Sequence, residues 1–411
     1  MILFRCPATS RVKSMSKQYN PTVIDLFAGG GGLSSSLEAV GWRAVAAVEI
    51  DPHAVLTLQA NQSRGHLKGT SVLHADIREV RAGDLRPSTC KSNWRPDLLA
   101  GGPPCQPFSS AGLMKSYRDP RGRLFHEFVR LADELRPRFI LFENVAGLVT
   151  AKSPSGEVGG VLRHIQREFE SIGYACRFAL LNAADYGAPQ RRVRLYMIGA
   201  RGERLPEFPA PTHARHGAPL LPWVTLGQLL STQPTPAQTD IVLPSARRAR
   251  ELAELTPGTG LRSIGIIEAN RPSGHWGYRQ DCFVADLDLP SRTIRAASTP
   301  DWLNFDGYIR RLTWRECAAL QGFPAEWQFV GTVASRFRQV GNAVQGHIGR
   351  ALGEQLYTAA KVKQRARSIS VDWPANFYKR VRYTAMEEVV NGAHRRAARE
   401  RSDGAITPAM V

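Results

Sequence analysis

The sequence predicts an α/β fold, a doubly wound and mostly parallel sheet with a second, smaller and loop-rich unit. Three observations lead to this fold class. Short apolar runs alternate with amphipathic stretches over residues 21–201, a glycine-rich turn follows the first run, and the pattern becomes irregular over residues 202–290. Strands that alternate with helices along a chain build a parallel sheet covered by helices on both faces.

Seven apolar runs have the length and composition of buried strands. They alternate with helical stretches whose apolar residues recur every three or four positions. The expected strands are residues 22–27, 43–50, 70–77, 96–102, 138–145, 176–183 and 192–200. The expected helices between them are residues 33–42, 52–61, 123–137 and 160–173.

The later part of the chain begins with the irregular residues 202–290, which are rich in Pro, Thr, Gly and Arg. Residues 311–324, RLTWRECAALQGFP, then predict a helix, and apolar residues on one face predict another helix after QVGNAV. The tail 361–411 holds 11 Lys or Arg and 5 Asp or Glu. We therefore expect a basic, partly helical extension there.

The chain of 411 residues is strongly basic, with 54 Lys and Arg against 36 Asp and Glu and a formal net charge of +18. Such an excess favours a polyanionic partner, because neutralising phosphates releases counterions. Six cysteines stand singly, without CxxC or HExxH, which disfavours a metal site and a disulfide framework. No apolar run has the length of a signal peptide or a membrane span, so we expect a cytoplasmic protein.

Polar and flexible residues follow the first three expected strands. The turn AGGGGL contains Gly29 and leads into a helix, whose N-terminal N–H groups favour a polar ligand. The second strand ends at Glu49, 20 residues after Gly29, where an acid binds ribose hydroxyls, and Asp76 follows the third. Because parallel strands end at one edge, these residues predict a nucleoside site. The form DLFAGGGGL favours S-adenosylmethionine over a nicotinamide cofactor.

A lone cysteine, Cys105, stands in GGPPCQPFSS after a buried strand. A structural cysteine needs no rigid backbone around it, since packing holds a small buried hydrophobe. A reactive thiolate must instead be exposed, electrostatically supported and aimed. The sequence therefore predicts that Cys105 is a nucleophile.

Together these motifs resemble the cytosine-C5 DNA methyltransferases of bacterial restriction-modification systems. The resemblance covers about residues 21–360 in the family's usual order. DLFAGGGG, VEIDP and HADI are similar to the family's cofactor motifs, GGPPCQPFS to its nucleophile loop and FENV to its acid motif. PQRRVRLYMIG is similar to the arginine motif, and RLTWRECAALQGFP and QVGNAV to the two closing motifs. The nucleophile loop departs from the family at Ser110-Ala111.

The resemblance implies covalent chemistry at a flipped-out cytosine. Cys105 is then the nucleophile that adds at C6, Glu143 binds N3, and Arg192 and Arg194 act near O2 and beside the thiolate, while Asn144 orders the loop. The implied cofactor contacts are Phe27, Ala28, Gly29, Gly31, Gly32, Leu33, Glu49, Ile50, Asp76, Ile77, Pro103, Leu124, Asn342 and Ala343. The expected DNA contacts are Gln106, Ser109, Lys115, Arg121, His275, Trp276, Tyr278 and Arg279. No metal is implied.

The resemblance also divides the chain. The expected parts are an N-terminal extension at 1–20, a Rossmann-like S-adenosylmethionine-binding catalytic domain at 21–204, a target-recognition domain at 205–305, a return to the catalytic domain at 306–360 and a basic C-terminal extension at 361–411. We expect a monomer that acts on double-stranded DNA in the bacterial nucleoid, with a cognate restriction endonuclease acting separately.

Two alternative functions fit the sequence less well. One branch of the family methylates tRNA, but the insert of about 90 residues is long enough to read DNA bases. A binding-only regulator would not need Cys105, Glu143 and Arg194 together. A tRNA cytosine-C5 methyltransferase stays as the alternative function.

Overall fold

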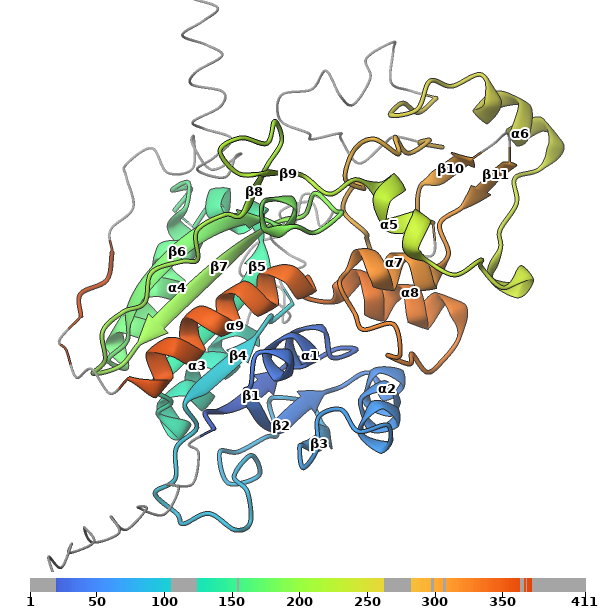
Figure 1. Cartoon of the computed structure of the whole chain (residues 1–411). Helices are drawn as coiled ribbons and strands as arrows, with labels where there is room; N and C mark the ends of the chain where they lie inside the picture. Colours follow the sequence, from blue (N-terminus) through green and yellow to red (C-terminus); the bar gives the residue numbers. More distant parts are fainter. Residues whose placement is uncertain are drawn as a thin grey trace, which may run out of the picture.

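The structure is a computed structural model that describes residues 20–104, 124–153, 155–261, 282–296, 299–305, 308–362, 366 and 368–371. Its centre is a seven-stranded sheet in the order β3-β2-β1-β4-β5-β7-β6 (Figure 1). The first five strands in that order are parallel, whereas β7 runs antiparallel to both β5 and β6. The predicted fold class, a mostly parallel doubly wound sheet, is confirmed.

All seven predicted strands are present. Their bounds are β1 Thr22–Leu26, β2 Arg43–Glu49, β3 Ser71–His74, β4 Leu98–Gly101, β5 Phe139–Val145, β6 Ala175–Asn182 and β7 Val193–Ala200. β3 ends earlier than the sequence predicts, so Asp76 lies in the loop after the strand. The register pairs Leu26 with Val48 and Gly101, and Gly101 with Phe142. The carboxyl ends of β1, β2, β4 and β5 therefore form one edge.

Helices cover both faces of the sheet, as the alternating pattern predicts. Their bounds are α1 Gly32–Ala39, α2 Pro52–Ser63, α3 Leu124–Leu135, α4 Gly160–Ser171 and α9 Gly346–Lys361. Successive residues of β1 enter opposite cores: Val23 packs with α1 and α9, and Ile24 packs with α3 and α4. This division follows from the alternation of side chains along a strand.

α1 and α9 lie unusually close to each other because α9 carries glycines at their contact. A Cβ atom on Gly349 would lie 2.7 Å from Cβ of Ser36. A Cβ atom on Gly353 would lie 2.9 Å from Cδ2 of Leu37. The indole of Trp42, just after α1, donates a hydrogen bond of 2.9 Å to the carbonyl of Gly353. The closing helix is thereby fixed to the first βα unit.

The residues between β7 and α7 form a smaller unit of short elements, beside the sheet in Figure 1. Its elements are β8 His213–Ala214, β9 Leu221–Pro222, α5 Leu226–Thr232, η5 Gln238–Asp240, α6 Ala246–Ala253, β10 Trp302–Phe305 and β11 Tyr308–Arg311. Leu252, Val284, Trp302 and Ile309 form a small core that joins α6, β10 and β11, whereas Leu226 of α5 packs into the main core beside the sheet. β10 and β11 pair antiparallel, so this hairpin spans the expected domain boundary between residues 305 and 306.

The chain then returns to the sheet through α7 Trp314–Leu320 and α8 Val333–Asn342, with η3 Ala146–Thr150 and η4 Ala183–Tyr186 at strand ends. The helix expected over 311–324 is shorter, because Thr313 and Glu316 form a capping box at its start. The apolar periodicity of residues 333–342 does not predict a helix, yet these residues form α8.

After α9 the chain passes along the free edge of the sheet. The N–H of Val371 donates to the carbonyl of Cys176 in β6, at 3.0 Å. The N–H of Cys176 donates to Oγ of Ser370, at 2.9 Å. These contacts cover part of an edge strand that would otherwise present unpaired backbone groups. No helix among the described residues combines the length and apolar composition needed to cross a bilayer.

Candidate active site

The glycine turn after β1 has the backbone conformation that its sequence predicts. Gly29 and Gly31 have φ values of 55° and 88°, in the left-handed region that favours glycine. A Cβ atom on Gly31 would lie 2.6 Å from the Trp327 ring, whereas one on Gly29 would meet no atom within 4 Å. Gly31 is therefore needed for packing against the closing part of the chain, and Gly29 borders open space that a ligand can enter.

Glu49 closes this turn onto the end of β2. Its Oε2 accepts a hydrogen bond of 2.7 Å from the N–H of Gly29. Its Oε1 accepts from the N–H groups of Ile50 and Asp51, both at 2.8 Å. The side chain of Ile50 is 60% exposed beside it. An acid, a bare glycine backbone and an exposed apolar side chain at one strand edge suit the ribose and the base of a nucleoside.

The other expected cofactor residues differ in their burial. Asp76 is held by Arg78, whose guanidinium lowers the pKa of that carboxyl to about 2. Ile77 is 5% exposed and packs in the core, so only its backbone is available to a ligand. The side chains of Ala28, Leu33, Pro103 and Ala343 are also buried, and those of Phe27 and Leu124 are half-buried.

Asp25 lies beneath the glycine turn and is 1% exposed. Its Oδ2 accepts a hydrogen bond of 2.5 Å from Oγ of Ser34 in α1. Burial raises the pKa of Asp25, the Ser34 hydrogen bond opposes this rise and the nearby charge of Glu49 adds to it, and the resulting pKa is about 7. The carboxyl thus joins β1 to the first turn of the helix that follows the glycines.

The end of β4 leads directly to Glu143 on the neighbouring strand. A Cβ atom on Gly102 would lie 2.9 Å from Oε2 of Glu143, so glycine is needed at this approach. Nδ2 of Asn144 donates to the carbonyl of Pro103 at 3.2 Å. This hydrogen bond is the contact through which Asn144 would order the loop that carries Cys105, as the sequence predicts. The next residues in the chain, Pro104 and Cys105, continue from this point.

Glu143 forms an ion pair with Arg194 of β7, with Nε and Oε1 separated by 3.5 Å. The antiparallel register brings them together, because Arg194 pairs with Val145, two residues beyond Glu143. Burial raises the pKa of Glu143, and the charges of Arg194 and Arg192 oppose the rise. The balance leaves a carboxyl group that gives up its proton less readily than an exposed one.

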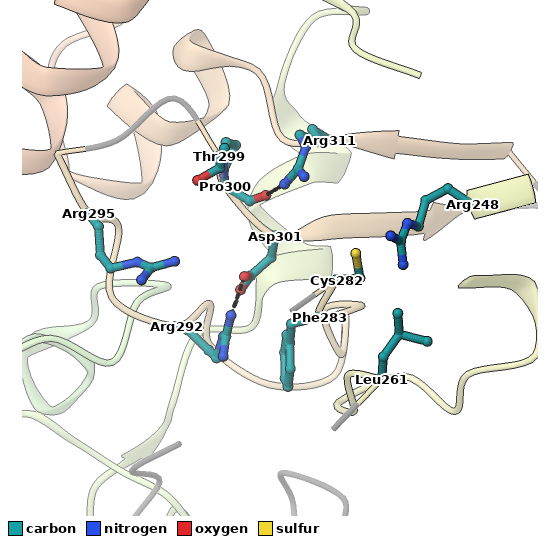
Figure 2. A pocket seen from close by; sticks show the side chains of 10 residues that line it. All are labelled: Arg248, Leu261, Cys282, Phe283, Arg292, Arg295, Thr299, Pro300, Asp301 and Arg311. Carbon is teal, nitrogen blue, oxygen red and sulfur yellow. Dashed lines mark hydrogen bonds and ion pairs between the residues drawn. The ribbon is translucent and has the colours of Figure 1, made fainter. Parts of the chain in front are cut away.

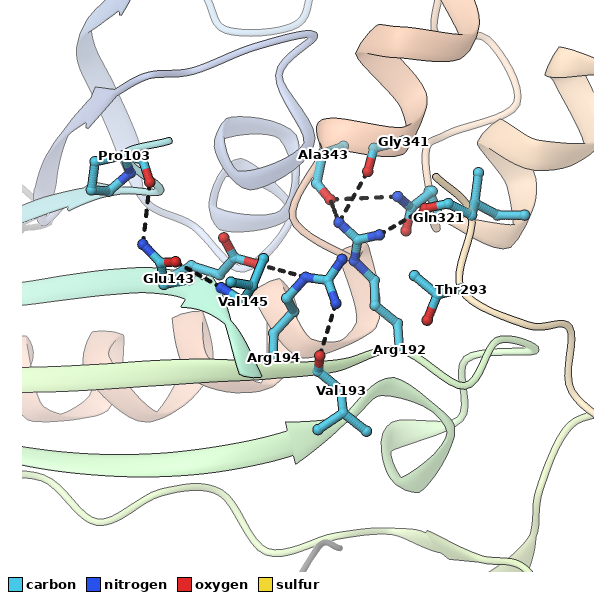
Figure 3. Close-up of polar contacts among 12 residues, drawn as sticks. Pro103, Glu143, Val145, Arg192, Val193, Arg194, Thr293, Gln321, Gly341 and Ala343 are labelled. Atoms are coloured by element: carbon cyan, nitrogen blue, oxygen red, sulfur yellow. Dashed lines mark hydrogen bonds and ion pairs between the residues drawn. The ribbon is translucent and has the colours of Figure 1, made fainter. Parts of the chain in front are cut away.

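Arg192, expected beside Arg194, is buried to 2% exposure and lies near it in Figure 3. Its Nη1 donates to the carbonyl of Ile294 at 3.0 Å. Its Nη2 donates to the carbonyls of Gly341 and Ala343, at 3.1 and 3.0 Å. Burial lowers the pKa of this guanidinium to about 9. Arg192 is thus engaged with the backbones of the smaller unit and the end of α8.

Two glutamines that sequence reasoning missed complete this buried network. Nε2 of Gln190 donates to Oε1 of Gln321 at 3.1 Å. Oε1 of the same Gln190 accepts from the N–H of Ile294, also at 3.1 Å. Nε2 of Gln321 donates to the carbonyl of Val340 at 2.7 Å. Both glutamines stand inside recognised motifs, PQRRVR and LQGFP, which was the available signal.

Nine expected site residues lie outside the described residues. They are Cys105, Gln106, Ser109, Lys115, Arg121, His275, Trp276, Tyr278 and Arg279. Within the described ranges, no group of three or more His, Cys, Asp or Glu side chains is arranged to hold a metal ion.

The family described as C-5 cytosine-specific DNA methylase matches residues 21–358 of this chain. The chain belongs to this family. The DNA methylase is 32% identical over 366 residues to the type II methyltransferase M1.HphI of Haemophilus parahaemolyticus, covering 87% of this chain and 92% of that protein. It is 32% identical over 341 residues to M.NgoMIV of Neisseria gonorrhoeae, covering 83% and 98%. The resemblance stated from the motifs is confirmed.

Solved structures share the fold of this DNA methylase. A prophage-encoded DNA modification methyltransferase structure from E. coli matches with a TM-score of 0.64 at 24% identity, covering 83% of this chain and all of that one. A DNMT2 structure from Spodoptera frugiperda matches with a TM-score of 0.55 at 17% identity, covering 82% and 99%. At these identities the likeness concerns the fold alone.

We predict that Asp25→Asn removes a pH dependence from the stability of the DNA methylase. Because the pKa of Asp25 rises from 3.8 to about 7 on folding, the folded state holds this proton more tightly. The stabilisation is full below about pH 4 and is lost as the pH rises through 7, with an upper limit of about 4 kcal/mol. Denaturant titrations at about pH 5 and about pH 8 should show a smaller loss for the variant. Equal losses would contradict the raised pKa.

We predict that Arg192→Met destabilises the fold by about 1.5–3 kcal/mol, because buried carbonyls lose a charged donor. Hydrogen exchange should accelerate at residues 293–295, which Arg192 holds through Ile294. Arg247→Met is the control, since the Arg247 side chain is 87% exposed, and it should change stability by about 0.5 kcal/mol or less. Unchanged exchange at 293–295 in Arg192→Met would exclude this positioning role.

Proposed function

We propose that this DNA methylase transfers a methyl group from S-adenosylmethionine to C5 of a flipped-out cytosine within a specific double-stranded DNA sequence. One observation carries the proposal. Glu143 and Arg194, a buried acid and a cation, lie 3.5 Å apart beside the segment that leads into Cys105. The glycine turn and Glu49 end at the same edge of the sheet. Glu143 and Arg194 suit the activation of a cytosine ring, and the glycine turn with Glu49 suits the binding of the methyl donor.

The residues at the glycine turn fit S-adenosylmethionine. Glu49 would bind the ribose hydroxyls, Ile50 would pack on the base, and the open space at Gly29 would admit the ligand against the backbone. Asp76 would accept from the adenine, and its low pKa keeps it ionised. When bound, S-adenosylmethionine supplies an electrophilic methyl group. Phe27, Leu124, Asn342 and the buried neighbours of the turn would complete the site.

The cytosine ring is activated by this chain's own side chains. C5 is a poor nucleophile, so the Cys105 thiolate first adds to C6, and the electron pair of the C5–C6 double bond moves toward N3 and O2. Glu143 stabilises that charge by donating a proton or hydrogen bond at N3, and Arg194 by donating at O2. C5 would then form a bond to the electrophilic methyl group, the S–CH3 bond of the donor would break, and S-adenosylhomocysteine would leave. Loss of the C5 proton and cleavage of the C6–S bond release the product and restore the thiolate.

A stacked cytosine cannot reach these groups, so the target base must leave the duplex, at a cost of a few kcal/mol. We assign Gln106, Ser109, Lys115 and Arg121 to the loop that would close over the flipped base. Sequence reading is assigned to residues 205–305, with His275, Trp276, Tyr278 and Arg279 as the chosen contacts. We also propose that the enzyme acts as a monomer in the bacterial nucleoid, separately from a cognate restriction endonuclease. The type II methyltransferase relatives support the restriction-modification context of this proposal.

Arg192 is proposed as a positioning residue. Its guanidinium donors are directed at three carbonyls, from the smaller unit and from α8. It supports the site by its charge near Glu143 and by fixing the strand that carries Arg194.

We predict that a duplex containing 5-fluorocytosine traps the enzyme covalently. Fluorine at C5 permits thiolate addition and methyl transfer but leaves no proton for the final elimination. Denaturing gel electrophoresis should show an adduct only when S-adenosylmethionine is present. Cys105→Ala should abolish the adduct, whereas Cys90→Ala, which changes a free and partly exposed cysteine between β3 and β4, should keep it. Adducts on tRNA and never on duplex DNA would establish the tRNA alternative instead.

We predict that Glu49→Ala weakens S-adenosylmethionine binding by about tenfold or more, since a hydrogen bond to a charged group contributes about 1.5–3 kcal/mol. Calorimetry with the cofactor measures the change. Glu79→Ala removes an exposed carboxylate of the loop after β3 and should leave the affinity unaltered. An unchanged affinity of Glu49→Ala would move the ribose contact to another residue.

A further inference from the structure

A cavity of about 500 Å³ lies in the smaller unit, and its described lining includes four arginines and one acid. The arginines are Arg248 of α6, Arg311 of β11, and Arg292 and Arg295 of the segment between Phe283 and β10. Figure 2 shows the side chains of Arg248 and Arg295 entering from opposite sides. The acid is Asp301.

Two of these arginines are fixed by their neighbours. Arg292 binds Asp301 through two hydrogen bonds, of 2.9 and 2.5 Å, and lies 3.7 Å from the centroid of the Phe283 ring. Arg311 lies 4.1 Å from the centroid of the Trp302 ring and donates to the carbonyl of Pro300. The aromatic rings hold the two guanidinium planes in place, which prepares them for a planar, bidentate contact.

Positive charge exceeds negative charge in this cavity. Asp301 neutralises Arg292, and Glu251 pairs with Arg248 at 2.7 Å while also binding Arg247. No acid within the described residues pairs with Arg311, and none of those residues forms a hydrogen bond or ion pair with the guanidinium of Arg295. Among the described residues, four guanidinium groups face two carboxylates, so two positive charges remain unbalanced within that part of the chain.

This arrangement costs free energy in the absence of an anion. Burial lowers the pKa of Arg311, the electrostatic contacts with Cys282 and Asp301 oppose this fall, and the charge of Arg248 adds to it. Like charges in a partly enclosed space repel each other more strongly than they would in open water. A bound anion would remove this repulsion, and guanidinium groups bind phosphate oxygens in pairs of parallel hydrogen bonds.

The cavity is connected to the active site through the backbone. Arg295 directly follows Ile294, whose carbonyl accepts from Arg192 and whose N–H donates to Gln190. The backbone of Arg295 also packs against α8, where a Cβ atom on Gly341 would lie 2.2 Å from its carbonyl carbon. A ligand held by Arg295 is therefore fixed relative to Glu143 and Arg194. Among phosphate-bearing ligands, the DNA substrate is the one that must be held in a fixed position relative to Glu143 and Arg194.

We propose that this cavity, with Arg248, Arg295 and Arg311, binds a backbone phosphate of the DNA duplex and positions it relative to the active site. The inference rests on the proposed function, because it takes the ligand to be the DNA substrate. A phosphate contact fixes register and orientation without reading the base sequence. The three arginines therefore contribute to affinity for every duplex, in contrast to residues that select the target.

The test measures the binding of a fluorescein-labelled duplex of arbitrary sequence by anisotropy, over a series of salt concentrations. Arg248→Gln and Arg295→Gln should each weaken binding several-fold and reduce the slope of log K against log salt by about one. Arg248→Lys and Arg295→Lys should keep the slope. Arg247→Gln is the matched control, since it changes the neighbouring arginine of α6, which lies outside the cavity lining and should leave affinity and slope unaltered.

Three outcomes would overturn the proposal. If wild type and the glutamine variants bind duplex with equal affinity and slope, the cavity holds no phosphate of DNA, while the proposed function stands. If the variants relax discrimination between target and arbitrary duplexes at an unchanged slope, these arginines contact bases. If inorganic phosphate binds wild type but not the variants, and at constant ionic strength leaves duplex binding unchanged, the cavity is a site for a free anion. A wild type without any affinity for duplex would instead refute the proposed function as well.

Discussion

The buried guanidinium of Arg192 is the contact on which the arrangement of this site depends. It joins three backbone segments that are far apart in sequence, namely the start of β7, residue 294 of the smaller unit and residues 341 and 343 at the end of α8. A buried cation without partners would cost several kcal/mol, so these carbonyls and the cation require one another. The consequence is geometric: the strand carrying Arg194 and the smaller unit are held as one piece.

The balance of charge at the catalytic edge follows from this packing. Desolvation is the largest influence on both Glu143 and Arg192, and it acts against charge on each of them. The ion pair with Arg194 opposes it but does not outweigh it, because the pKa of Glu143 remains raised. A raised pKa means that Glu143 holds a proton more readily than an exposed carboxyl group, and a protonated carboxyl can donate to a ring nitrogen, whereas an ionised one can only accept. Burial therefore supplies the property that the proposed chemistry needs.

The sequence predicted the parts of the fold that depend on local pattern. Strands β1 to β7 and the covering helices follow from apolar periodicity, and Glu49 and Glu143 follow from their places at strand ends. Periodicity did not find the contacts of Gln190 and Gln321, since these depend on segments more than a hundred residues apart. Periodicity also did not distinguish the exposed side chain of Ile50 from the buried side chain of Ile77. Both follow an acid after a strand, yet one side chain is exposed and the other lies in the core.

The arginines of the smaller unit were beyond the reach of sequence reasoning for a similar reason. In the sequence they are scattered among the basic residues of an irregular region, and the net charge of +18 indicates only that some surface meets a polyanion. Folding separates two kinds of arginine. Arg192 and Arg194 are matched by carbonyls and by Glu143, so their charge is balanced within the protein. Arg295 has no acid of its own among the described residues, yet it directly follows Ile294, whose carbonyl Arg192 holds. Arg311 has the nearby charge of Asp301, but Asp301 is already paired with Arg292. A charge left unbalanced on a rigid segment beside the active site is balanced most directly by the phosphates of the molecule that enters it.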